Sequence, residues 1–142
     1  MGQIAVVFDT NVLISGLGFG GKPKECIDLA VMGDVQMVIS EDALDEFRRV
    51  LTYDRLPFDE EEQRTLPDEL IRLTGAKVIN PEVSVEVIED DPDDDVFLEC
   101  ALAAGADYIV SGNDHLLDEN PFRGIKIVEP AEFLSLIRDR SC

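Results

Sequence analysis

Uninterrupted apolar runs recur along the chain and predict the strands of a buried sheet. The first run, Ile4 to Phe8, is rich in β-branched residues and ends on the carboxylate of Asp9. A run of this kind, with no polar alternation, is typical of a parallel strand that helices cover on both faces. Five strands are expected, at residues 4–9, 35–39, 77–79, 107–111 and 125–128.

Amphipathic segments between these strands predict helices. The expected helices are residues 23–32, after a loop at residues 16–21; a helix that begins after the N-cap Ser40; residues 59–75, interrupted near Pro67; a helix that opens among residues 93–95 and stops at Gly105; and residues 130–138. Residues 80–89 have no assignable pattern. Because strands alternate with helices, the chain is expected to form a single domain, residues 1–142, with a three-layer α/β/α fold around a parallel sheet.

The charge of the chain is strongly negative: 31 acids against 12 bases leave a formal net charge of −19. A field of this sign repels phosphate backbones and argues against generic nucleic-acid binding. Bound divalent cations, or a cytoplasm salty enough to screen the field, would remove that objection. Arg outnumbers Lys and Asp outnumbers Glu, which we interpret as a sign of a salt-adapted source.

Composition also limits where the protein acts. No apolar stretch approaches the roughly 18 residues of a membrane span, and no basic region precedes an apolar signal segment. We therefore expect a cytoplasmic protein with no membrane partner. Cys26, Cys100 and Cys142 are too few and too widely spaced for a disulfide framework or a zinc cluster, and Cys100 is expected to fill the core.

Two carboxylates stand at positions where a charge needs a partner. Asp9 follows a buried strand, so it either caps the next helix or binds a ligand at the carboxyl edge of the sheet; Asn11 can bond the local backbone in the same way. Glu46 lies at the margin of the apolar stripe of its helix, while Asp45 and Arg49 point further out. Its partner is either Arg49, at i+3, or a cation.

The segment from Glu89 to Asp95 places six acids in seven positions before an apolar helix. The helix dipole favours one or two acids there, not six. Their mutual repulsion suggests a bound cation, and hard oxygen ligands suit Mg²⁺ or Mn²⁺ rather than zinc. Asp95 is the candidate ligand because Leu98 and Leu102 follow at i+3 and i+7, so its side chain shares their inward face. The other acids are interpreted as a solvated loop.

Small polar groups follow the fourth expected strand at the same sheet edge. Asn113 or Asp114, which follow Ser111 in the chain, could complete a cation site. His115 is the only histidine of the chain, so a site built on several histidines is excluded. We expect it at the surface, and it is a weak candidate for proton transfer.

Four segments, taken in order, resemble PIN-domain nucleases, and in particular the toxin-like branch related to the ribonucleases of toxin–antitoxin operons. They are VFDTNVLISGL, ISEDALDEFRRVL, DPDDDVFLECALAAGADYIVSGNDHLL and KIVEPAEFLSLI. The resemblance runs from Ile4 to Ile137 and is least anchored at residues 54–88. It implies a five-stranded parallel sheet of order 3-2-1-4-5 and an acidic pocket that holds Mg²⁺ or Mn²⁺.

The resemblance also implies roles for individual residues. Asp9, Glu46 and Asp95 correspond to the catalytic, metal-binding acids, with Asn11, Ser15 and Ser111 in support. Where many members have Thr-Gly-Asp after the fourth strand, this chain has Ser111-Gly112-Asn113; Asn113 keeps a carbonyl ligand but loses a charge, and Asp114 is the alternative ligand. The candidates for contacts with flanking phosphates are Arg48, Arg49, Lys22 and Lys24.

The expected activity is metal-dependent hydrolysis of RNA phosphodiesters by the toxin of a toxin–antitoxin pair. By resemblance, we also expect a homodimer and an antitoxin that inserts near the acidic pocket. The alternative is a catalytically weak or inactive PIN-like module that binds RNA or a protein, which the neutral Asn113 favours. A haloacid-dehalogenase-type phosphotransferase is a poor fit because it needs a second acid where this chain has Asn11. A response-regulator receiver is a poor fit because no Lys follows the expected late strand.

Overall fold

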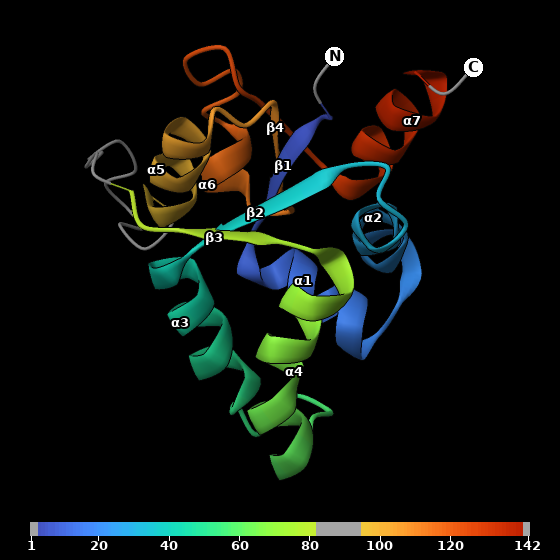
Figure 1. The fold of residues 1–142 in the computed structure, drawn as a ribbon, viewed down its shortest axis with the longest axis vertical. Coiled ribbons are helices and arrows are strands. Elements are labelled where there is room, and N and C mark those ends of the chain that lie inside the picture. The colour runs from blue at the N-terminus through green and yellow to red at the C-terminus, as the bar shows by residue number, and fades with distance from the viewer. Residues whose placement is uncertain (1–2, 82–94, 141–142) are drawn as a thin grey trace.

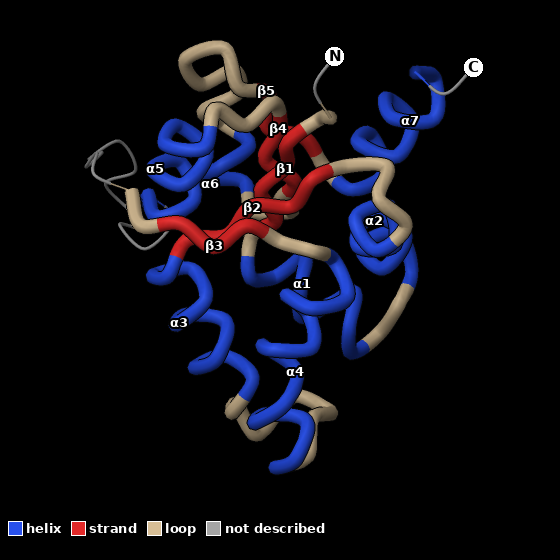
Figure 2. The backbone as a smooth tube through the Cα atoms, in the orientation of Figure 1, coloured by secondary structure: helices blue, strands red, loops and turns tan. Residues whose placement is uncertain are grey.

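Five parallel strands form one sheet in a computed structural model that describes residues 3–81 and 95–140. The sheet order is β3-β2-β1-β4-β5, which confirms the predicted order (Figure 2). The strands are β1 (Ala5–Phe8), β2 (Gln36–Ser40), β3 (Lys77–Ile79), β4 (Tyr108–Val110) and β5 (Lys126–Val128). All five lie within a residue or two of the expected ranges. The pattern is clearest for β1, β2 and β4, which are almost wholly buried.

Helices connect the strands and enclose the sheet. They are α1 (Thr10–Gly18), α2 (Gly21–Val31), α3 (Glu41–Leu51), α4 (Glu60–Thr74), α5 (Asp95–Ala104), α6 (Asp114–Leu117) and α7 (Pro130–Arg140). Figure 1 shows α5 and α6 on one side of the sheet and α1, α3 and α4 on the other, while α7 packs against α2. The three-layer α/β/α architecture expected from the sequence is therefore confirmed.

The expected loop at residues 16–21 is wrong, because α1 begins directly after Asp9 and continues to Gly18. Gly16 belongs to the helix for a packing reason: a Cβ atom there would lie 2.5 Å from Cδ1 of Ile27. Its bare backbone therefore lets α1 approach α2 closely. The turn between the two helices is confined to Phe19 and Gly20, and Gly20 has a φ of +80°.

The interruption expected near Pro67 is also absent, since α4 is continuous from Glu60 to Thr74. Its start is fixed by a capping box in which Asp59 and Glu62 each accept a backbone N–H of the other. Gly75 ends it with a φ of +65°. Pro67 removes one N–H from the helix, but it is buried together with Leu70, and this packing maintains the helical path.

The central strand β1 forms the middle of the core. Val6, Val7 and Phe8 are at most 1% exposed, so both faces of the strand are covered as predicted. On one face, the ring of Phe133 from α7 meets the rings of Phe8 and Tyr108 edge-on, at centroid distances of 6.2 and 5.5 Å. Because the strands are parallel, β1, β2 and β4 end at one edge of the sheet, and this edge carries the candidate site.

Candidate functional site

Asp9 lies at the junction between β1 and α1. Its backbone N–H donates to the carbonyl of Val110, 3.1 Å away, and so extends the β1–β4 pairing by one residue. Its side chain then caps α1, since Oδ1 accepts the N–H of Val12 at 2.8 Å. Asp9 as a whole is 3% exposed. The capping interpretation of Asp9 is therefore confirmed. The cap uses Oδ1, one of the two carboxylate oxygens.

The second oxygen of Asp9 is held by Ser111, the residue that follows β4. The Ser111 hydroxyl donates to Oδ2 of Asp9 and accepts the backbone N–H of Asn113 at 2.9 Å. Ser111 is fully buried, and its own N–H bonds to Val128 at 3.0 Å. The Asp9 carboxylate is thus fixed from both sides by groups that the sheet itself positions.

Burial raises the pKa of Asp9, and hydrogen bonds from Ser111, from the backbone of Val12 and from the backbone of Gly112 act in the opposite direction. Among the described residues, no Lys, Arg or His forms an ion pair with Asp9. The sequence of residues 82–94 contains no basic residue either. Among the described residues, hydrogen-bond donors rather than an ion pair therefore oppose this charge, an arrangement that favours the binding of a cation.

Asp95 is the first residue of α5 and is 6% exposed, so the prediction that it turns inward is confirmed. Its place relative to the sheet follows from topology. Since β3 and β4 are parallel, α5 must run back from the carboxyl edge to the amino edge, so Asp95 lies at the carboxyl edge. Residues 89–94, which hold the rest of the acidic run, lie outside the described residues.

Glu46 is half-buried on α3, while Asp45 and Arg49 are exposed, as the position of Glu46 at the stripe margin predicts. It borders a cavity of about 280 Å³ together with Asp42, Asp45, Arg49 and Val96. Val96 directly follows Asp95 in α5. The cavity therefore separates Glu46 from the start of the helix that carries the third predicted acid.

The assignment of metal ligands stays a prediction. Within residues 3–81 and 95–140, no three His, Cys, Asp or Glu side chains are grouped so that they could hold a metal ion. The structure does join Asp9, Ser111 and Asn113 through hydrogen bonds. Asn113 Oδ1 caps α6 by accepting the N–H of His115 at 2.9 Å, and both Asp114 and His115 are exposed.

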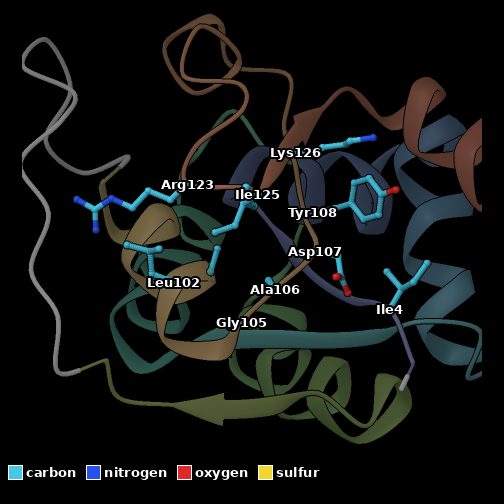
Figure 3. Close-up of a pocket in the computed structure, with 11 residues that line it drawn as sticks. Ile4, Leu102, Gly105, Ala106, Asp107, Tyr108, Arg123, Ile125 and Lys126 are labelled. Atoms are coloured by element: carbon cyan, nitrogen blue, oxygen red, sulfur yellow. The ribbon is translucent and has the colours of Figure 1, made fainter. Parts of the chain in front are cut away.

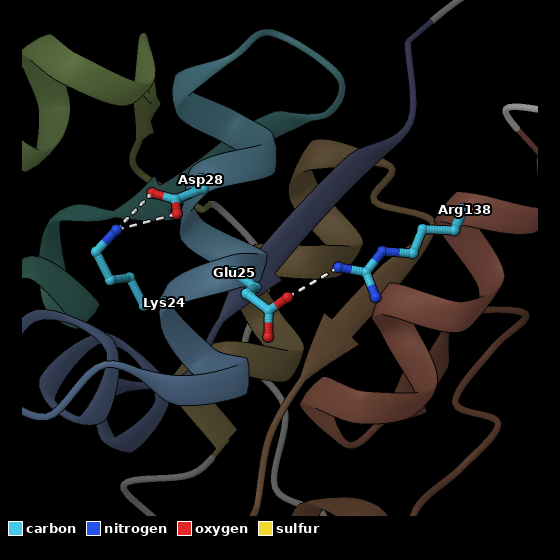
Figure 4. A network of polar contacts seen from close by, with 4 residues as sticks. All are labelled: Lys24, Glu25, Asp28 and Arg138. Atoms are coloured by element: carbon cyan, nitrogen blue, oxygen red, sulfur yellow. Dashed lines mark hydrogen bonds and ion pairs between the residues drawn. The ribbon is translucent and has the colours of Figure 1, made fainter.

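The candidate phosphate-binding residues differ in their surroundings. Arg48 forms an exposed ion pair with Asp45 at 3.0 Å. Lys24 pairs with Asp28, also at 3.0 Å, on the helix where Glu25 meets Arg138 of α7 (Figure 4). Arg49 and Lys22 are exposed, as is the predicted supporting residue Asn11, whereas Ser15 is half-buried. Arg48 and Lys24 are thus already partly neutralised by acids on their own helices.

Another cavity, of about 500 Å³, lies at the opposite, amino edge of the sheet (Figure 3). Asp107 in its lining accepts the backbone N–H of Ala5 at 2.9 Å, which gives this carboxylate a structural role. The side chains of Arg123 and Lys126 point away from each other. Its polar groups do not converge, so this cavity is a weaker candidate site than the edge that carries Asp9.

Thr10, the residue after Asp9, also belongs to this region, although it is not one of the predicted site residues. It is 4% exposed, and its hydroxyl has no hydrogen-bond partner among residues 3–81 and 95–140. Such a hydroxyl is rare in a folded protein. Its place next to Asp9 was the only indication that the sequence offered.

Comparison with known proteins places the chain in a family. The family model described as PIN domain matches residues 5–115, a range that includes Asp9, Glu46, Asp95 and Asn113. The chain belongs to the PIN domain family. A comparison with curated proteins finds no significant match.

Solved structures share the fold at low sequence identity. The chain is similar to VapBC2 from Rickettsia felis bound to a promoter DNA fragment, with a TM-score of 0.62 and 11% identity over 87% of this chain and 97% of that one. It is also similar to FitAcB from Neisseria gonorrhoeae, with a TM-score of 0.57 and 13% identity over 89% and 98% of the two chains. A third similar structure is FitAB bound to an IR36 DNA fragment, with a TM-score of 0.53 and 13% identity over 88% and 94%. In the described residues, no helix is long and apolar enough to cross a membrane.

Proposed function

We propose that this chain is an endoribonuclease of the PIN type that requires Mg²⁺ or Mn²⁺. The observation that carries the proposal is Asp9: a buried carboxylate without a basic partner among the described residues, at the carboxyl edge of the central strand. Membership of the PIN domain family supports the same activity. Asp9, Glu46 and Asp95 are the proposed catalytic acids.

The residues at this edge suit a hard divalent cation. Asp9, Glu46, Asp95, Asn113 and Asp114 offer oxygen ligands only, which favours Mg²⁺ or Mn²⁺ over zinc. When bound, the cation would activate a water for attack on the phosphodiester and neutralise charge on the leaving oxygen. Ser111 and the N–H of Val12 would keep the Asp9 carboxylate oriented, and their hydrogen bonds favour its ionised form.

The negative charge of the chain limits how RNA can approach. At −19, the protein repels a phosphate backbone unless local positive charge opposes the field. We assign that part to the cation and to Arg49, which is exposed and shares a cavity with Glu46. Arg48 is the weaker candidate because Asp45 already pairs with it.

The biological setting is proposed from the structural neighbours. VapBC2 and FitAB are complexes that are described as bound to DNA fragments. By this likeness we propose that the chain is the toxin of a toxin–antitoxin pair, acts as a homodimer in the cytoplasm and is inhibited by an antitoxin. A basic antitoxin segment would suit the acidic site.

A cleavage assay tests the activity. The chain is incubated with labelled RNA and single-stranded DNA in Mn²⁺, Mg²⁺ or EDTA, at low and high KCl. We expect RNA cleavage that EDTA abolishes and that Asp9→Asn slows by about 100-fold or more, since a cation contributes several kcal/mol to the transition state. Asn retains the helix cap. The matched control Asp68→Asn, an exposed acid in α4, should cleave at the wild-type rate.

Two results would contradict the proposal. Equal cleavage by Asp9→Asn and the wild type would mean that the activity comes from a contaminant. Equal cleavage of RNA and DNA would refute the assignment of RNA as the substrate while leaving the nuclease assignment in place.

A second candidate is a PIN-like module without catalytic activity that binds RNA or protein. Asn113 favours it, because this residue is neutral and its amide oxygen already caps α6. Titration calorimetry with Mn²⁺ separates the two candidates. An inactive site should bind Mn²⁺ poorly, whereas the nuclease should bind it at a defined stoichiometry.

A further inference from the structure

Thr10 carries a buried hydroxyl that forms no hydrogen bond with the part of the chain that the structure describes. It is the first residue of α1 and is 4% exposed, and within the described residues its Oγ1 is the buried side-chain polar atom without a partner. The neighbouring polar groups are all paired: Asp9 with Val12 and Ser111, and Ser111 with Asn113. The unpaired hydroxyl therefore lies next to a carboxylate, that of Asp9, both of whose oxygens accept hydrogen bonds.

The backbone next to this hydroxyl is held by hydrogen bonds. The first turn of α1 is fixed by the bond from Val12 to the Asp9 side chain and by the bond from Leu13 to the Asp9 carbonyl, at 2.8 and 3.2 Å. Valine has nearly the shape of threonine and needs no hydrogen bond. At this position threonine thus costs stability that valine would not, which indicates a role outside the metal-free fold.

We propose that the Thr10 hydroxyl is a positioning group that bonds a water in the shell of the cation held by Asp9. This inference rests on the proposed use of a divalent cation. Consecutive Cα atoms are about 3.8 Å apart, so Thr10 lies at the same edge of the sheet as Asp9. A cation–water distance of about 2.1 Å and a hydrogen bond of about 2.8 Å together span roughly 5 Å. A hydroxyl can both donate to and accept from such a water.

Three variants test the proposal by metal affinity and stability, without any activity measurement. Thr10→Val removes the hydroxyl and keeps the shape, and Thr10→Ser keeps the hydroxyl. Thr74→Val is the matched control, because Thr74 is equally buried at 6% exposure but its hydroxyl donates to Leu70 at 2.7 Å. Each protein is stripped with EDTA and titrated with MnCl₂ by calorimetry in 1 M KCl, which screens unspecific binding to the acidic surface. Thermal unfolding is followed with and without Mn²⁺.

We expect Thr10→Val to bind Mn²⁺ about tenfold more weakly than the wild type. A loss of this size is usual when a group that hydrogen-bonds to a metal ligand is removed. Its Tm without metal should be equal to or about 3 °C above that of the wild type. Thr10→Ser should keep the wild-type affinity. Thr74→Val should show the reverse pattern: a lower Tm without metal and an unchanged affinity for Mn²⁺.

Other outcomes overturn the proposal. Wild-type affinity in Thr10→Val would mean that the hydroxyl has no part in cation binding, and a clearly lower metal-free Tm would mean that it is paired in the fold. If the wild type binds no Mn²⁺, the cation site itself is refuted. If the predicted affinities are found but RNA is not cleaved, Thr10 keeps its positioning role and only the nuclease assignment fails.

Discussion

Replacing Ser111 with alanine should destabilise the metal-free protein more than an ordinary buried serine would. The variant removes two hydrogen bonds at once, one to the Asp9 carboxylate and one from the backbone of Asn113. Alanine leaves Asp9 Oδ2 and the Asn113 N–H without these partners. No water can easily replace the hydroxyl, because Ser111 is fully buried.

The magnitude follows from the two bonds. A hydrogen bond to a charged group contributes about 1.5–3 kcal/mol and a neutral one about 0.5–1.5 kcal/mol, so we expect a loss of about 2–4 kcal/mol. For a chain of this length that corresponds to a fall in Tm of about 6–12 °C. Loss of the Ser111 bond should also raise the pKa of Asp9 further, because this bond lowers it.

Ser40→Ala is the matched control. Ser40 is also buried and also accepts one backbone N–H, from Ala43 at 3.1 Å, as the N-cap of α3. It holds no carboxylate, and its replacement should cost about 1 kcal/mol. Urea unfolding of the wild type and both variants, in EDTA at pH 7, gives the two free energies of unfolding.

The difference between the two variants measures the bond from Ser111 to the ionised Asp9. A difference below about 0.5 kcal/mol at pH 7 would refute the reasoning. The difference should also shrink at acid pH, where Asp9 is protonated and its bond to Ser111 joins two neutral groups. A difference that stays constant down to pH 3 would show that the charge of Asp9 contributes nothing to it.

Three further predictions concern pH, salt and packing. Because burial raises the pKa of Asp9, the folded state binds this proton more tightly than the unfolded state, and the stability of the metal-free protein should fall as the pH rises from about 4 through the raised pKa. In urea titrations, the free energy of unfolding of Asp9→Asn should fall less steeply with pH than that of the wild type. Parallel curves of this free energy against pH for the two proteins would contradict the prediction. The net charge of −19 should make the urea midpoint rise between 0.1 and 2 M KCl, and a constant midpoint would refute the salt-adaptation hypothesis. Gly16→Ala should lower the stability by about 1–3 kcal/mol, since its Cβ would lie 2.5 Å from Ile27 Cδ1. In the described residues, a Cβ at Gly112 would meet no atom within 4 Å apart from its chain neighbours, so Gly112→Ala should change the stability by less than about 0.5 kcal/mol. Equal Tm values for the two variants would argue against this packing account.

The strands were predictable because their pattern is local. Residues 4–8 form a continuous apolar run, and the structure places β1 there with both faces covered. The burial of Asp95 was also predictable, since the leucines that follow it repeat with the helical period. In both cases the hydrophobic pattern of a short segment is enough to predict which residues are buried.

The failures have a tertiary cause. Glycines at positions 16, 18, 20 and 21 indicate a loop by local preference, yet Gly16 is helical because α1 must approach Ile27 of α2. Pro67 likewise indicates a break, yet α4 passes through it. Contacts with other elements outweigh local preference at these positions, and such contacts cannot be inferred from a short segment.

The candidate site also has features that the sequence predicts and features that depend on the tertiary structure. The sequence by itself determined which residue types stand at the ends of the strands: a carboxylate after β1 and small polar residues after β4. Only the tertiary structure decided that Ser111 contacts Asp9 across 102 residues, and that Thr10, beside them in α1, has a hydroxyl without a partner in the described residues. The reason is that these contacts depend on the pairing of Phe8 with Val110, and the register of a parallel pair is set by the packing of the whole sheet.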